Sequence, residues 1–294
     1  MLRELARLPE VQRLEALATR IETPSGAEAP MVWRRWGAGE GSAGNAGGQA
    51  GPPLVLLHGG SGSWMHWLRN IDALARHYTV YAADLPGCGE SGLPPGGRDA
   101  DSIYETVAAG IAELTGGAPV ELVAFSFGTL VAGFISAHQP QRVKRLHLVG
   151  CAGLGLTRPR LFLQSLPESG DPDASEAVVR HNMLALMVKH PQTLDDQALS
   201  LHYANLLQDR LRRRRISRTP VTIELQAQWK CPVRAIWGEG DILIRNDGER
   251  LREAFAGCDL RDLSLVEDAG HWVQYERAEA FNRLLLRNLA AADD

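Results

Sequence analysis

Short apolar runs alternate with helical patterns over most of the chain. Short apolar runs are typical of buried strands, and apolar residues at every third or fourth position are typical of amphipathic helices. Strands that alternate with helices predict βαβ units and a mostly parallel sheet. The predicted strands are Leu54–Leu57, Thr79–Ala83, Val120–Phe125, Val143–Val149, Val233–Trp237 and Leu263–Glu267. The predicted helices are Leu68–Arg76, Ser102–Thr115, Phe127–His138, Asp247–Phe255 and Ala278–Leu289.

The first part of the chain carries other patterns. Regularly spaced leucines over residues 1–18 predict a helical lead-in that is interrupted at Pro9. Thr19–Thr23 and Met31–Trp36 predict an antiparallel hairpin. Residues 37–51 contain seven glycines, and a strand follows them, not a helix. We therefore expect a flexible surface loop there and no phosphate site.

The alternation breaks once, between residues 152 and 230, where helical periodicity continues without a convincing strand. The chain has 294 residues, about twice a usual single-domain length of roughly 150. We interpret residues 152–230 as a helical cap inserted into one α/β domain, which is formed by residues 1–151 and 231–294.

Composition and charge indicate a soluble globular protein. Hydrophobic residues make up 45% of the chain and charged residues 22%, and the formal net charge is −4. This balance favours neither nucleic acid nor a membrane surface as a partner. Four cysteines without a CxxC pair predict free thiols, with no disulfide framework and no metal site. No apolar run is long enough for a signal sequence or a membrane span, so we expect a cytoplasmic protein.

One serine lies where a predicted strand gives way to a helix. Ser126 has the small residues Ala124 and Gly128 two positions to either side. A sharp strand-to-helix turn of this kind exposes a nucleophilic hydroxyl, and small neighbours let the two backbones approach closely. The pattern predicts a nucleophile elbow, although a serine that only caps the helix would give the same motif.

Two later residues supply what a serine nucleophile needs. Asp241 and His271 each follow a predicted parallel strand, and the carboxyl ends of such strands meet at one edge of the sheet. A histidine can accept the serine proton, and an acid can orient the histidine. We expect Ser126, His271 and Asp241 to form a triad, with Glu239 and Asp247 as alternative acids.

Four motifs together resemble the α/β-hydrolase superfamily, over residues 32–289. They are the sequence His58-Gly59-Gly60, the segment from Asp84 to Ser91, the serine elbow, and the Asp241 and His271 pair. The resemblance implies an α/β-hydrolase fold, with a mostly parallel central sheet flanked by helices and an inserted cap. It also implies an oxyanion hole formed by the N–H groups of Phe127 and Gly60, since acyl transfer places negative charge on the carbonyl oxygen.

Other residues near these motifs have two interpretations. Ser61, Trp64, Phe125 and Trp272 are candidate substrate-binding residues, although aromatic side chains are as often core. We expect His58 to brace the oxyanion loop and Asp84 to stabilise a turn. Six arginines between positions 210 and 218 usually mark a solvated helix face, but one of them could bind a substrate carboxylate.

The serine at the elbow argues against haloalkane dehalogenases and epoxide hydrolases of this fold, which have aspartate there. The meta-cleavage-product hydrolases, which cut a carbon–carbon bond, are the most similar subgroup on the HGG motif, Gly153-Leu154-Gly155, and the segments 270–276 and 279–284. The chain departs from them in having Phe125 before the serine and Ser61 after the HGG motif.

We therefore predict first a carboxylic-ester hydrolase that acts through an acyl-enzyme. A carbon–carbon bond hydrolase acting on vinylogous diketone acids is the second choice. A small-molecule receptor with a slow or vestigial triad is the third. Each acts on or binds a small molecule without a cofactor or metal, and a monomer or homodimer is expected.

Overall fold

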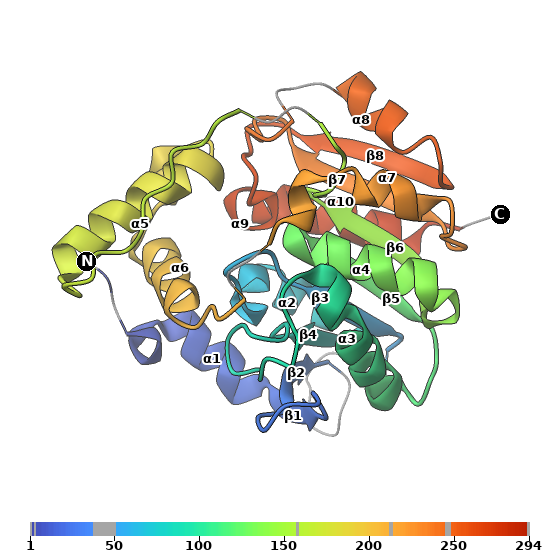
Figure 1. The fold of residues 1–294 in the computed structure, drawn as a ribbon, viewed down its shortest axis with the longest axis horizontal. Coiled ribbons are helices and arrows are strands. Elements are labelled where there is room, and N and C mark those ends of the chain that lie inside the picture. Colours follow the sequence, from blue (N-terminus) through green and yellow to red (C-terminus); the bar gives the residue numbers. More distant parts are fainter. Residues whose placement is uncertain are drawn as a thin grey trace.

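A computed structural model describes residue 2 and residues 4–37, 51–156, 159–211, 214–244 and 248–292. In these residues an eight-stranded sheet forms the centre of the molecule, with the strand order β1-β2-β4-β3-β5-β6-β7-β8 (Figure 1). Most of the predicted glycine-rich loop, residues 38–50, lies outside the described residues.

The sheet is parallel except for one strand. β1 (Thr19–Thr23) and β2 (Met31–Trp36) form the predicted hairpin, and β2 also pairs antiparallel with β4 (Thr79–Ala83). The remaining pairs are parallel. Their strands are β3 (Pro53–Leu57), β5 (Val120–Phe125), β6 (Val143–Val149), β7 (Val233–Gly238) and β8 (Leu260–Val266).

Both faces of the sheet are covered, because successive side chains along a strand point to opposite faces. On β5, Leu122 and Ala124 pack into one hydrophobic core, and Val123 and Phe125 pack into the other. The first core also receives α3 (Ala100–Thr115), α4 (Phe127–His138) and α8 (Gly248–Ala254). The second receives α1 (Pro9–Leu17), α2 (Ile71–Ala75), α9 (Val273–Glu276) and α10 (Ala278–Ala290).

Between β6 and β7 the described residues form helices and no strand. α5 (Pro172–Leu186) and α6 (Asp196–Leu207) pack against each other beyond the edge of the sheet (Figure 1). α7 (Val221–Gln226) instead packs against the core helix α4. We therefore propose that the cap consists of α5, α6 and their connections, and that α7 belongs to the core. No helix in the described part of the chain is long and apolar enough to span a bilayer.

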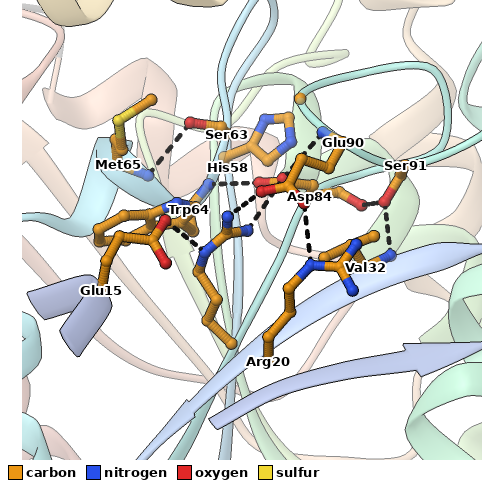
Figure 2. A network of polar contacts seen from close by, with 12 residues as sticks. Glu15, Arg20, Val32, His58, Ser63, Trp64, Met65, Asp84, Glu90 and Ser91 are labelled. Carbon is orange, nitrogen blue, oxygen red and sulfur yellow. Dashed lines mark hydrogen bonds and ion pairs between the residues drawn. The ribbon is translucent and has the colours of Figure 1, made fainter. Parts of the chain in front are cut away.

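A buried network of polar contacts lies behind the loop that follows β3. Asp84, only 2% exposed, accepts the N–H of Trp64 through Oδ1 at 3.0 Å and the N–H of Glu90 through Oδ2 at 3.1 Å (Figure 2). The guanidinium of Arg34 pairs with Asp84 at 3.2 Å, with Glu15 at 2.8 Å and with Glu90. Asp84 thus joins the end of β4 to the loop after β3, as a turn-stabilising residue would.

We predict that Arg34→Met lowers the free energy of unfolding by about 3 kcal/mol, because it leaves the buried Asp84 carboxylate without its cation. The matched control is Arg35→Met on the same strand. Among the described residues, the side chain of Arg35 has one polar contact, of 3.4 Å with the Thr19 hydroxyl, so this variant should stay within about 1 kcal/mol of the wild type. Urea unfolding at neutral pH measures both values, and equal losses in the two variants would contradict the assignment.

Candidate active site

The backbone holds Ser126 in a strained turn between β5 and α4. Its φ is 48° and its ψ −112°, a conformation that non-glycine residues adopt only when the surroundings force it. The N–H of Ser126 donates to the carbonyl of Val149 on the neighbouring strand at 2.8 Å. A Cβ at Gly128 would lie 2.5 Å from the carbonyl oxygen of His58, so glycine is required for this approach. The local geometry is that of the predicted elbow.

Three side chains from three strand ends lie in one hydrogen-bonded chain. His271 Nε2 is 2.8 Å from Ser126 Oγ, and His271 Nδ1 is 2.7 Å from Asp241 Oδ2. The other carboxylate oxygen of Asp241 accepts the N–H of Leu243 at 2.9 Å, which fixes the carboxylate plane. The imidazole and the carboxylate are almost fully buried. This arrangement can move a proton from the serine to the histidine while the aspartate holds the ring in place.

Glu239, one of the two alternative acids, does not take the place of Asp241. Glu239 is exposed, and its N–H pairs with the carbonyl of Val266. Asp247 lies outside the described residues. Asp268, close to His271 in sequence, is exposed and pairs instead with cationic side chains such as Lys189. Within the described chain, Asp241 is the carboxylate that His271 contacts.

The loop after β3 is held by His58. Its Nε2 accepts the N–H of Leu85 at 2.8 Å, and its Nδ1 lies 2.7 Å from the carbonyl oxygen of Gly59. Burial lowers the pKa of His58, in agreement with a neutral ring that has one accepting and one donating nitrogen. Gly60, which follows, and Phe127, at the first turn of α4, both face the same cavity as Ser126. The two expected oxyanion donors therefore line the same cavity as the serine, and their role as donors stays a prediction.

The cavity has a volume of about 910 Å³ and lies between the sheet edge and the cap. Ser61 and Phe125, two of the predicted substrate-binding residues, line it together with Ser126 and His271. Side chains of α5 and α6, among them His202, also line the cavity. The sequence carries no signal that marked the cap residues, because their helical spacing is the same whether a side chain faces a cavity or another helix.

The other two predicted substrate-binding residues are core residues. Trp64 is 2% exposed and stacks beneath the guanidinium of Arg34, whose carbon is 5.3 Å from the ring centroid. Trp272 is 1% exposed, stacks on Tyr275 with centroids 4.1 Å apart, and donates its Nε1–H to the carbonyl of His66. Neither lines the cavity. Their sequence proximity to the site reflects packing beneath it.

Two described arginines of the predicted run line the cavity. Arg214 lines it beside Gly60 and Ser61, and Arg218 lines it farther along the segment. Arg212 and Arg213 lie outside the described residues. Among the residues that are described, no cluster of three His, Cys, Asp or Glu side chains could hold a metal ion.

Comparisons with known proteins identify the family of this chain. A family model described as "Alpha/beta hydrolase family" matches residues 54–284. A dihydrolipoyllysine-residue acetyltransferase component of an acetoin cleaving system from Pseudomonas putida is 34% identical over 251 residues, which are 82% of this chain and 64% of that protein. The chain thus spans less than two thirds of that relative's length.

A second relative is a 2-hydroxy-6-oxononadienedioate/2-hydroxy-6-oxononatrienedioate hydrolase from Escherichia coli, 27% identical over 269 residues, 83% of this chain and 89% of that protein. Among solved structures, naproxen esterase from Bacillus subtilis superposes with a TM-score of 0.69 at 18% identity, covering 95% of both chains. At that identity the likeness concerns the fold. The predicted fold, a mostly parallel sheet flanked by helices, is confirmed.

The buried histidine of the cap generates a prediction about stability. Burial lowers the pKa of His202 to about 4, and its Nδ1 has no hydrogen-bond partner among the described residues. Because the folded-state pKa lies below the ordinary value of about 6.5, His202 stabilises the fold above that pH, and this contribution is lost as the pH falls from about 6.5 to about 4.

We expect His202→Gln to reduce the loss of unfolding free energy between pH 7 and pH 4 by up to about 3 kcal/mol. Denaturant unfolding at several pH values measures this slope. The control is His77→Gln, which alters an exposed histidine and should leave the slope as in the wild type. Identical slopes in wild type and His202→Gln would show that His202 is not protonated on unfolding.

Proposed function

This chain belongs to the alpha/beta hydrolase family, and from that premise we propose that it hydrolyses a carboxylic ester through Ser126, His271 and Asp241. The observation that carries the proposal is the pair of short contacts at His271, 2.8 Å to the serine hydroxyl and 2.7 Å to the aspartate. A histidine with a hydroxyl on one nitrogen and a carboxylate on the other is arranged as a general base for that hydroxyl.

The proposed reaction has two halves. His271 accepts the proton of Ser126 as Oγ attacks the ester carbonyl, and the N–H groups of Phe127 and Gly60 stabilise the oxyanion, each by roughly 3–4 kcal/mol. The protonated histidine then gives its proton to the leaving alcohol, and an acyl-enzyme remains. A water molecule, deprotonated by His271, attacks the acyl group and restores the serine.

The environment of the serine favours an ester over a carbon–carbon bond. Phe125, directly before Ser126, lines the cavity and packs on the ring of His271 with centroids 5.0 Å apart. An apolar ring at this position offers no hydrogen bond to a polar dienolate, whereas it suits an apolar part of an ester substrate. Carbon–carbon bond hydrolysis remains the second candidate because the Escherichia coli relative carries the name of a hydrolase of a dienedioate.

The cytoplasm is the compartment we propose. The four cysteines are free thiols, which a reducing compartment would preserve.

We predict burst kinetics with 4-nitrophenyl acetate, because acylation of Ser126 releases nitrophenol before the acyl-enzyme is hydrolysed. Stopped-flow absorbance should show a burst that approaches one equivalent per active site when deacylation is slower than acylation. Ser126→Ala should remove both the burst and the steady-state rate. The control is Ser136→Ala, which alters a buried serine of α4 whose hydroxyl donates to the carbonyl of Ala132.

The outcome separates the candidate functions. Faster cleavage of a coloured dienolic diketone acid than of any ester would favour the carbon–carbon hydrolase. Tight binding of a small molecule without turnover of any ester would favour a receptor. Ester turnover that survives in Ser126→Ala would refute the proposed nucleophile.

A further inference from the structure

A cap arginine places a positive charge against the expected oxyanion loop. A Cβ on Gly60 would lie 2.6 Å from Nη1 of Arg214, so the guanidinium rests directly on this glycine. The guanidinium carbon of Arg214 is also 5.4 Å from the ring centroid of Phe127. The two residues proposed to hold the oxyanion therefore share one cationic neighbour.

Contacts with the cap and the loop fix this guanidinium. Nη2 of Arg214 pairs with Asp209, just beyond α6, and Ser61 Oγ donates to the same Asp209 carboxylate at 2.6 Å. Among the described residues, the hydrogen-bond contact of Arg214 Nη1 is one of 3.3 Å with Ser61 Oγ. Since each terminal nitrogen carries two hydrogens, Nη1 retains donor capacity towards the cavity that it lines.

The charged side chains on the described wall of the cavity are all arginines. Arg160 and Arg218 line the cavity in addition to Arg214, and neither forms an ion pair within the described chain. No aspartate or glutamate is among the described residues that line it, and Asp209, the partner of Arg214, is not one of the lining residues. A wall with three guanidinium groups and no carboxylate favours a negatively charged ligand.

We propose that the substrate is an acidic ester, one that carries a free carboxylate besides the ester bond, and that Arg214 binds this carboxylate next to the attacked carbonyl. The inference rests on the proposed ester hydrolysis and specifies its substrate class. A guanidinium and a carboxylate form paired charge-assisted hydrogen bonds, which discriminate strongly against an uncharged analogue.

The alternative for Arg214 is a purely structural one, a link between cap and core through Asp209. The two roles differ in what they change. A structural link affects neutral and charged esters alike, whereas a carboxylate-binding residue changes the ratio of their kcat/KM values. This ratio does not depend on the fraction of folded enzyme, so it remains informative if a variant is partly unfolded.

The test uses two substrate pairs that differ in one negative charge. The first pair is the 4-nitrophenyl monoester of hexanedioic acid and its methyl ester, with the charge on the acyl chain. The second is the butyrate ester of 4-hydroxybenzoic acid and that of methyl 4-hydroxybenzoate, with the charge on the leaving group. The wild type should prefer the charged member of at least one pair. The preferred pair shows whether Arg214 binds the acyl side or the leaving-group side of the ester.

In Arg214→Met this preference should fall by about ten- to a hundredfold, mainly through KM, and Arg214→Lys should retain a part of it. The matched control is Arg215→Met, which changes the adjacent, exposed arginine and should keep the wild-type ratio. The inference is overturned if the wild type prefers neither charged ester, or if Arg214→Met keeps the wild-type ratio.

Failure of the inference can be told from failure of the proposed function. Turnover of neutral esters without charge preference refutes the acidic substrate and leaves ester hydrolysis intact. If no ester is cleaved, ester hydrolysis fails. Calorimetric titration of Ser126→Ala, with and without Arg214→Met, then decides the inference. In Ser126→Ala, monomethyl hexanedioate should bind more tightly than dimethyl hexanedioate. In the double variant with Arg214→Met, this difference in affinity should disappear.

Discussion

The proposed chemistry of this protein depends on the hydrogen bonds of one imidazole. In the proposed mechanism His271 activates Ser126 while its other nitrogen faces the carboxylate of Asp241, and the three groups come from chain positions 126, 241 and 271. The parallel sheet brings these distant positions together, because the carboxyl ends of β5, β7 and β8 lie at one edge of the sheet. The strained backbone of Ser126 is compatible with that edge only because Gly128 lets α4 approach the end of β3.

The loop after β3, which carries the proposed oxyanion donor Gly60, is held by a second set of buried contacts. His58 and Asp84 tie the loop after β3 to the end of β4, and Arg34 from the antiparallel strand balances the charge of Asp84. A donor for the oxyanion must be in place before charge develops, so a loop fixed by buried partners is better suited to this role than a mobile one. Arg214 also contacts this loop, at Gly60.

The sequence predicts most of the sheet, since a buried strand leaves a short apolar run. Val120–Phe125 and Val143–Val149 have their predicted bounds, while β8 begins at Leu260 instead of Leu263 because exposed Arg261 interrupts the apolar run. Residues that follow strand ends, such as Asp241, can be found from the sequence for the same reason. The positions of Trp64 and Trp272 cannot be predicted in this way, because an aromatic ring suits a core and a pocket equally. The choice of Arg214 among six arginines depends on a contact with Gly60, 154 positions earlier in the chain, which no local pattern encodes.

Covalent labelling of the serine tests the central claim most directly. A fluorophosphonate reacts with a serine hydroxyl only where a base and an oxyanion site activate it, and mass spectrometry of the digested protein identifies the modified residue. The account predicts one adduct per chain, located on Ser126, with labelling slowed by orders of magnitude in His271→Ala. An unlabelled protein, or an adduct on another residue at the same rate in both forms, would contradict it.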